Sequence, residues 1–161
     1  ILAENGIPVR SMGDMVRAEV KARGLEEAPH IFGEVATLLR KEHGDDVLAH
    51  RLTDAVDELL KDNSIVLIEG LRGTAEREVF CSHWGDNFVI VAITASKQLR
   101  FERVQSRARS EDGDLSDLEA RDLRETGWGL DVIIQEANFS FSNESNLEDL
   151  KKEVSAWLDN L

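Results

Sequence analysis

The sequence lacks the features of a secreted protein, of a membrane protein and of a protein stabilised by a bound metal. Cys81 is the only cysteine, so no internal disulfide can form, and a reducing cytosol is the expected compartment. No apolar run approaches the roughly 20 residues that span a bilayer, so we expect no membrane segment. The four histidines show no metal-ligand spacing with Cys81 and are expected at or near the surface.

Positive charge is also scarce. Lys and Arg number 19 against 32 Asp and Glu, a net charge of -13. This balance disfavours a nucleic-acid-binding surface, because phosphate backbones require clustered cations. It fits either a protein adapted to high salt or an ordinary acidic cytosolic protein. The basic residues are mostly arginine, whose guanidinium suits bidentate phosphate contacts.

Short apolar, β-branched runs alternate with helical patterns along the whole chain. This order predicts a doubly wound α/β fold with a parallel sheet buried on both faces. We find no repeat, no low-complexity stretch and no long linker, so residues 1–161 are expected to form a single domain. The predicted strands are residues 7–9, 65–68, 88–93 and 139–142, and the predicted helices are 14–23, 31–42, 46–61, 74–84, 96–109, 116–125, 130–137 and a last one opening at 145.

In such sheets, ligands bind at the carboxyl ends of the strands. After the first strand comes Ser-Met-Gly-Asp-Met-Val-Arg, residues 11–17. Gly13 permits a tight backbone turn. Asp14 lies in the first helical turn, where an anion is favoured, and Arg17 follows one turn later. The pattern fits a binding loop, or a helix in which Asp14 only caps and Arg17 is only surface.

The second predicted strand ends in Glu69-Gly70-Leu71-Arg72. A carboxylate at this place in P-loop enzymes orients Mg²⁺, usually through water. Arg72 could then hold a phosphate. The alternative is an acidic residue after a strand with no such role.

Arginines recur along the helix after the third strand and in the loop that follows it. The members are Arg100, Arg103, Arg107 and Arg109. The first three share a face at three- and four-residue spacing. They could close over a triphosphate and stabilise charge during phosphoryl transfer. The alternative is a solvated face that pairs with Glu102 and Glu111.

Together these segments resemble known nucleotide kinases. Residues 11–17 look like the monophosphate-binding Gly-Asp-x-x-Arg segment of adenylate kinases. Nearly the whole chain resembles an archaeal family of predicted nucleotide kinases related to adenylate kinase, cytidylate kinase and dephospho-CoA kinase. The segments that carry this resemblance are Gly6-Ile7-Pro8-Val9, Met12-Gly13-Asp14, Arg40-Lys41-Glu42-His43-Gly44, Glu69-Gly70-Leu71-Arg72, Arg100-Phe101-Glu102-Arg103 and Arg121-Asp122-Leu123-Arg124-Glu125.

The resemblance implies a P-loop kinase-type α/β domain that moves the γ-phosphoryl group of ATP to a nucleotide or nucleotide-like acceptor, with Mg²⁺ present. Residues 12–62 would form a helical acceptor-binding arm and residues 100–124 a mobile lid. The implied roles fall to the strand-end residues and arginines already named: Gly13, Asp14 and Arg17 bind the acceptor, Glu69 orients the metal's hydration shell, and Arg72, Arg103, Arg107 and Arg109 neutralise phosphate charge.

The family's first strand and its Gly-Lys phosphate loop have no counterpart in this sequence, whose first residues look like the end of the helix that follows that loop. We therefore expect a sheet without its first central strand, in a fragment of a longer polypeptide or a cropped sequence. Glu69 and Asn138 also stand where the family usually carries Asp. A dephospho-CoA-kinase-like enzyme and a catalytically silent module that binds a protein or RNA partner are the alternatives. We expect turnover from a longer protein and none from these residues alone.

Overall fold

The computed structural model describes residues 1–107, 109 and 112–160. Strands and helices alternate along the chain, as the sequence predicts, and most boundaries lie within two residues of the expected ones. The strands are β1 (Val9–Ser11), β2 (Leu67–Glu69), β3 (Val91–Thr94) and β4 (Phe139–Ser142). The helices are α1 (Met12–Ala22), α2 (Pro29–His43), α3 (Val47–Leu60), α4 (Thr74–Trp84), α5 (Lys97–Arg107), α6 (Leu115–Gly127), α7 (Leu130–Gln135) and α8 (Leu147–Leu158), with 3-10 turns at Ala3–Asn5 and Gly85–Asn87.

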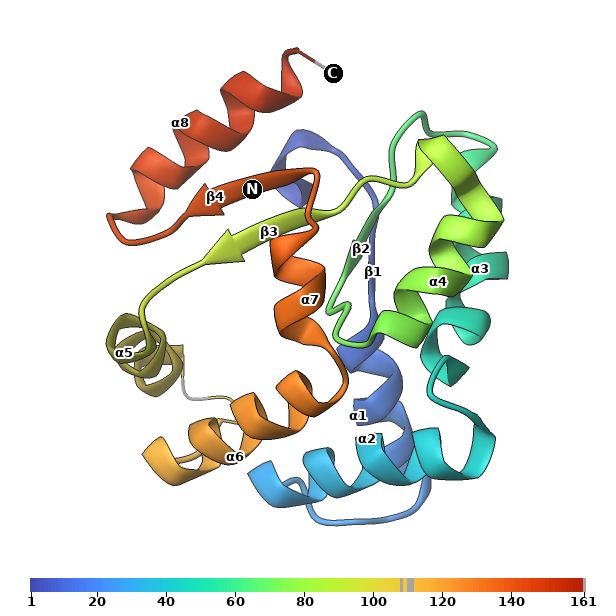
Figure 1. The fold of residues 1–161 in the computed structure, drawn as a ribbon, viewed down its shortest axis with the longest axis vertical. Helices are drawn as coiled ribbons and strands as arrows, with labels where there is room; N and C mark the ends of the chain where they lie inside the picture. The colour runs from blue at the N-terminus through green and yellow to red at the C-terminus, as the bar shows by residue number, and fades with distance from the viewer. Residues whose placement is uncertain (108, 110–111, 161) are drawn as a thin grey trace.

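The strands form two separate parallel pairs. β1 pairs with β2, and β3 pairs with β4. In the first pair Ser11 lies opposite Glu69, and in the second Thr94 lies opposite Ser142. The α/β class with parallel strands flanked by helices is thus confirmed (Figure 1).

The main core lies where α1, α2, α3 and α4 meet. Val20, Leu39 and Phe80 are completely buried there, and Leu48 and Leu52 join them. Within each of these helices, buried side chains recur at three- and four-residue spacing, so each helix presents one buried face to its neighbours. This packing fixes α1 against β2 and so holds the carboxyl ends of β1 and β2 in place.

The expectation that every strand is buried on both faces is wrong. Val89 is 43% exposed and Ile93 is 56% exposed, and Ile65 before β2 is 40% exposed. Among the strands that the structure describes, β2 and β3 share no hydrogen bonds with each other. Both are therefore edge strands, each with one edge that has no strand neighbour. The apolar side chains near these edges are left exposed.

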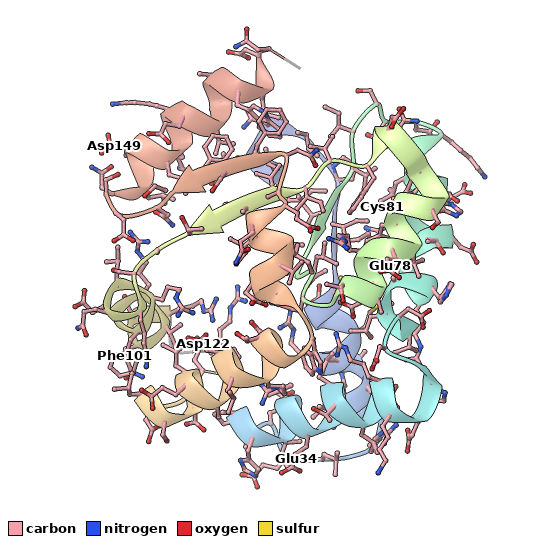
Figure 2. The ribbon with its side chains drawn as sticks, viewed as in Figure 1. Glu34, Glu78, Cys81, Phe101, Asp122 and Asp149 are labelled. Carbon is pink, nitrogen blue, oxygen red and sulfur yellow. The ribbon has the colours of Figure 1, made fainter. Side chains whose placement is uncertain are left out.

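The second pair of strands is covered by α8, which lies along β4 in Figure 1. The ring centroid of Trp157 lies 5.3 Å from that of Phe139 and 5.8 Å from that of Phe141. Cys81 is a free, exposed thiol on α4 (Figure 2). No helix in the described residues is long and apolar enough to cross a membrane.

Candidate functional site

The carboxyl ends of β1 and β2 bring a hydroxyl and a carboxylate together. The Oγ atom of Ser11 donates a hydrogen bond of 2.5 Å to Oε1 of Glu69. The same hydroxyl oxygen accepts from the backbone amide of Asp14 at 3.3 Å, which makes Ser11 the N-cap of α1. The parallel register of the two strands causes this contact, since Ser11 and Glu69 are directly opposite.

Asp14 and Arg17 form an ion pair on the first turns of α1. Nε of Arg17 donates to Oδ1 of Asp14 at 3.0 Å, and Nη2 contacts the same oxygen. The guanidinium folds back over Gly13, where a Cβ atom would lie 3.5 Å from both terminal nitrogens. Ser11, Gly13, Asp14, Arg17 and Glu69 are thus grouped at one edge, as predicted from the sequence.

The glycine that needs a left-handed backbone here is Gly70, with a φ of 92°, whereas Gly13 is an ordinary residue of α1. A Cβ on Gly70 would lie 3.5 Å from Cβ of Met12 and 3.6 Å from the amide nitrogen of Gly13. The loop after β2 therefore rests on the N-terminus of α1. The tight turn that the sequence permits at Gly13 is made by Gly70 instead.

Arg72 extends from this loop to α6. Its Nε atom lies 3.3 Å from Oε1 of Glu125, and its backbone amide donates to Oε2 of Glu76 at 3.4 Å. Arg72 is 41% exposed, so the ion pair with Glu125 is open to solvent and contributes little to stability. Its guanidinium can change partners at small cost, as a phosphate-binding group must.

A buried ion pair between α2 and α4 holds this loop in position. Nη2 of Arg40 on α2 lies 2.5 Å from Oε1 of Glu76 on α4. Oε2 of Glu76 also accepts from the amide of Gly73 at 3.0 Å. Burial raises the pKa of Glu76, and the opposing effect of Arg40 only partly offsets it. The guanidinium of Arg40 lies 3.9 Å from the ring centroid of Trp128.

Sequence reasoning did not assign a role to this pair. Arg40 lies in a segment that resembles the kinase family, and Glu76 lies in a predicted helix with no assigned role. One local signal exists, because Glu76 is the third residue of α4, where a carboxylate can accept from the amides of the preceding loop. The partner 36 positions away could not be found without the fold.

The arginines of α5 have partners within the protein. Nη1 and Nη2 of Arg100 bind the two carboxylate oxygens of Asp122 on α6 at 2.8 and 2.6 Å (Figure 2). Nη1 and Nη2 of Arg103 donate to the carbonyl oxygens of Asn143 and Ser145 at 2.6 and 2.7 Å. Arg103 therefore holds the loop after β4 and lies at the carboxyl end of the second strand pair.

Arg107 and Arg109 converge on Asp112, whose side chain is almost entirely buried. Nε of Arg107 donates to Oδ2 of Asp112 at 2.9 Å, and the amide of Arg109 donates to the same oxygen at 3.1 Å. Burial raises the pKa of Asp112, but the hydrogen bonds from Arg107 and from the amide of Arg109, together with the charges of Arg107 and Arg121, lower it overall. In Figure 1, α6 and α7 lie between α5 and α1, so the helix that ends at Arg107 is separated from the helix that carries Asp14.

Comparison with known proteins fits this arrangement. Residues 1–124 match the family model described as an AAA domain. A UPF0200 protein of Methanosarcina barkeri is 42% identical over 161 residues, covering 99% of this chain and 86% of that protein. The chain belongs to the UPF0200 family.

Other UPF0200 relatives share the similarity. One from Halobacterium salinarum is 38% identical over 92% of this chain and 77% of its own length. A UPF0200/UPF0201 protein of Archaeoglobus fulgidus is 41% identical over 96% of this chain, which spans about half, 48%, of that relative. These matches support a P-loop NTPase family with nucleotide-binding, kinase-like character and archaeal relatives.

Proposed function

We propose that this UPF0200 chain is the acceptor-binding and lid-bearing part of an ATP-dependent phosphotransferase that acts on a nucleotide or nucleotide-like acceptor. The observation that carries the proposal is the contact between Ser11 and Glu69, with Asp14 and Arg17 beside it. Residues 12–62 are proposed as the acceptor arm and residues 100–124 as the lid, within one domain of residues 1–161. The lid range includes residues 108, 110 and 111, which lie outside the described residues.

In this proposal Asp14 and Arg17 position the acceptor. Arg17 exchanges its bond to Asp14 for an acceptor phosphate, and Gly13 leaves the surface beneath that phosphate unobstructed. Arg72 reaches the same group after release from Glu125. Catalysis then consists of positioning and charge stabilisation, so no nucleophilic side chain is needed.

Glu69 is proposed to orient the hydration shell of Mg²⁺. An exposed carboxylate beside a hydroxyl fits this ion, which keeps several waters and takes one or two carboxylates along with substrate phosphates. The described residues contain no cluster of three or more His, Cys, Asp and Glu that would hold a metal alone. When bound, Mg²⁺ would neutralise phosphate charge.

Arg103, Arg107 and Arg109 are proposed to act on the donor phosphates when the lid closes. The guanidinium of Arg107 would leave Asp112 to do so, and Arg109 would follow as its backbone amide separates from the same carboxylate. Arg103 would act from α5, beside the loop after β4. A guanidinium already bound to a carboxylate has the geometry that a phosphate requires.

A further strand with a Gly-rich phosphate loop is proposed to pair between β2 and β3. The support is the absence of hydrogen bonds between these two strands in the described structure, and the exposure of Val89 and Ile93 at 43% and 56%. A strand inserted there would give both edges backbone partners and would cover these side chains. Such a loop would supply the amides that hold ATP phosphates.

A dephospho-CoA-kinase-like enzyme would share the reaction and differ in the acceptor. A silent binding module would share only the fold, and Glu69 and Asn138 standing in place of Asp favour it. Asn138 here has a structural use, because its Oδ1 atom accepts from the amide of Ile90 at 2.8 Å. The arginines at the strand ends favour the enzyme.

The test is phosphoryl transfer by the full-length protein as its native gene encodes it. ATP and Mg²⁺ are supplied with a panel of nucleoside monophosphates and dephospho-CoA, and products are resolved by chromatography. Arg17→Met should raise the KM for the acceptor more than that for ATP. Arg51→Met removes the same charge from α3 and serves as the control.

Phosphoryl transfer to a member of the panel would support the enzyme and identify its acceptor class, if Arg17→Met weakens this transfer and Arg51→Met does not. Equal loss of acceptor use and ATP binding in Arg17→Met would contradict the role of Arg17. ATP binding without transfer to any acceptor would replace the proposal with the silent module.

A further inference from the structure

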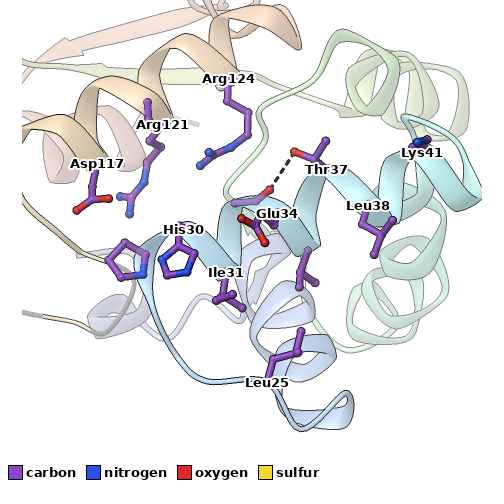
Figure 3. Close-up of a pocket in the computed structure, with 14 residues that line it drawn as sticks. Leu25, His30, Ile31, Glu34, Thr37, Leu38, Lys41, Asp117, Arg121 and Arg124 are labelled. Atoms are coloured by element: carbon purple, nitrogen blue, oxygen red, sulfur yellow. Dashed lines mark hydrogen bonds between the residues drawn. The ribbon is translucent and has the colours of Figure 1, made fainter.

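The outer side of α2 carries an exposed apolar stripe. Leu38 is 37% exposed, Ile31 is partly exposed, and Leu25 in the preceding loop is 42% exposed. Ile31 and Leu38 are seven residues apart, which is close to two helical turns, so they share one face of α2. Figure 3 shows these three side chains together, on the side of α2 that is turned away from α6. The stripe is therefore available to a second protein surface.

Two charged side chains of opposite sign flank this stripe. Glu34 and Lys41 are both exposed, and neither has a hydrogen bond or ion pair within the part of the chain that the structure describes. They too are seven residues apart, so they lie on the same flank of α2, about 10 Å from each other along the helix axis. This spacing is longer than the three or four residues at which helical side chains pair. Both charges are therefore left for a partner.

The opposite flank of the stripe is already occupied. Glu42 lies there, and its Oε2 atom accepts a hydrogen bond of 3.2 Å from Nη2 of Arg23. The unpaired charge next to the stripe is thus confined to the flank that carries Glu34 and Lys41.

A second copy of α2 complements this pattern. When two copies of the helix pack antiparallel about a two-fold axis near Leu38, the same flank of each helix lies on the same side of the interface, and the residue order is reversed. Glu34 of each copy then lies beside Lys41 of the other copy, once on each side of the axis. Leu38 meets its counterpart at the centre, and Ile31 and Leu25 lie toward the two ends. The order of charges on α2 is the order that a two-fold interface requires.

We propose that the outer side of α2, with the loop before it, is a two-fold interface between two copies of this protein. One helix and one loop from each copy bury less surface than a standard interface, so the dimer is transient. At physiological salt, charges are screened over about 8 Å, which limits the repulsion between two chains that each carry a net charge of -13. This inference goes beyond the proposed function and does not depend on phosphoryl transfer.

The test is sedimentation equilibrium of the full-length protein at physiological salt, over about 1 µM to about 1 mM, the range in which transient complexes dissociate. The wild type should show a reversible equilibrium between monomer and dimer. Leu38→Glu should raise the dimer Kd by at least about tenfold, because it places two carboxylates at the centre of the interface. Leu123→Glu is the matched control, since Leu123 is 77% exposed on α6, and it should keep the wild-type Kd.

Charge reversal tests the antiparallel arrangement. Glu34→Lys should raise the dimer Kd by at least about tenfold, because like charges then face each other on both sides of the axis. A general effect of net charge would act in the opposite direction, since this variant is less acidic than the wild type. Glu153→Lys, at an exposed position on α8, changes the net charge equally and should not weaken the dimer.

Mixing two variants gives the sharpest outcome. Lys41→Glu alone should weaken the dimer as Glu34→Lys does. An equimolar mixture of the two should form a mixed dimer with an affinity close to that of the wild type, because opposite charges again face each other.

A wild type that is monomeric at every concentration would overturn the proposal and leave the stripe to a protein of different sequence. A dimer that Leu38→Glu leaves intact would place the interface elsewhere and would also overturn it. Failure of the mixture to restore association would overturn the antiparallel pairing of Glu34 with Lys41.

Discussion

Arg40 and Glu76 form an ion pair inside the protein, with 2.5 Å between Nη2 and Oε1 and 4% and 0% of their side chains exposed. The pair joins α2 to the start of α4. Because Glu76 also binds the amides of Arg72 and Gly73, the same carboxylate ties the loop after β2 to α2. Motion of α2 is thereby linked to the position of Arg72.

Glu76→Gln should destabilise the fold by about 3–5 kcal/mol, because it leaves the charge of Arg40 buried without its carboxylate. The melting temperature should fall by roughly 10 °C for a domain of this size. The double variant Arg40→Met, Glu76→Leu removes both charges and should melt much closer to wild type. Equal losses in the single and double variants would show that packing, and not the charge, is decisive.

Asp57 should titrate below the ordinary value for aspartate. Trp84 donates from Nε1 to Oδ1 at 2.8 Å, and Nε2 of His83 lies 2.7 Å from Oδ2. The hydrogen bond from Trp84, followed by that from His83, lowers the pKa of Asp57. Because the pKa of Asp57 is lower in the folded protein, ionised Asp57 stabilises the fold at pH values above the ordinary pKa of aspartate. This stabilisation is lost as the pH falls through the lowered pKa. The indole N–H signal of Trp84 should report a midpoint below 3.8, the ordinary pKa; a midpoint at or above it would contradict the contact.

Gly33→Ala should stabilise the fold less than helix propensity alone predicts. The new methyl group gains about 1 kcal/mol of helix propensity but displaces the guanidinium of Arg124, so net stability should change little. Gly127→Ala is the matched control, because a Cβ there meets nothing within 4 Å, and it should stabilise by about 0.4–1 kcal/mol. Equal gains in melting temperature for the two variants would refute this account of Gly33.

Asp112→Asn should weaken the hydrogen bonds that hold Arg107 and the amide of Arg109. The carboxylate accepts from Arg107 and from the amide of Arg109, and weakening these bonds costs about 1–3 kcal/mol locally. Trypsin should then cleave after Arg107 and Arg109 at least about fivefold faster, since cleavage follows the population of the open form. Mass spectrometry of early digests gives the rate. The control is Asp131→Asn, at an exposed position on α7, and trypsin should cleave it at the wild-type rate.

The strand-end residues were predictable from the sequence because their positions follow from a local rule. Parallel strands end at one edge, so Ser11, Asp14 and Glu69 meet once the two strands pair in register. The alternation of apolar strands with amphipathic helices was sufficient to predict the α/β class.

The remaining features depend on distant segments packing together. The contact of Gly33 with Arg124 joins helices separated by some 90 positions, and the helical pattern of α2 gives no sign of it. The apolar character of residues 88–93 predicts that they are fully buried. It shows that these side chains favour burial, but it does not show which elements pack against them. The exposure of Val89 and Ile93 follows from the partners that β3 has in the fold.

The separation of the two strand pairs bears on cooperativity. Hydrogen bonds link β1 to β2 and β3 to β4, and in the described chain no ladder crosses from one pair to the other. The first pair is protected by the core of α1 to α4, and the second by α8. Amide hydrogen exchange should therefore resolve two protected regions with different opening free energies. A strand that bridged β2 and β3 would merge them into one unit that unfolds in a single step.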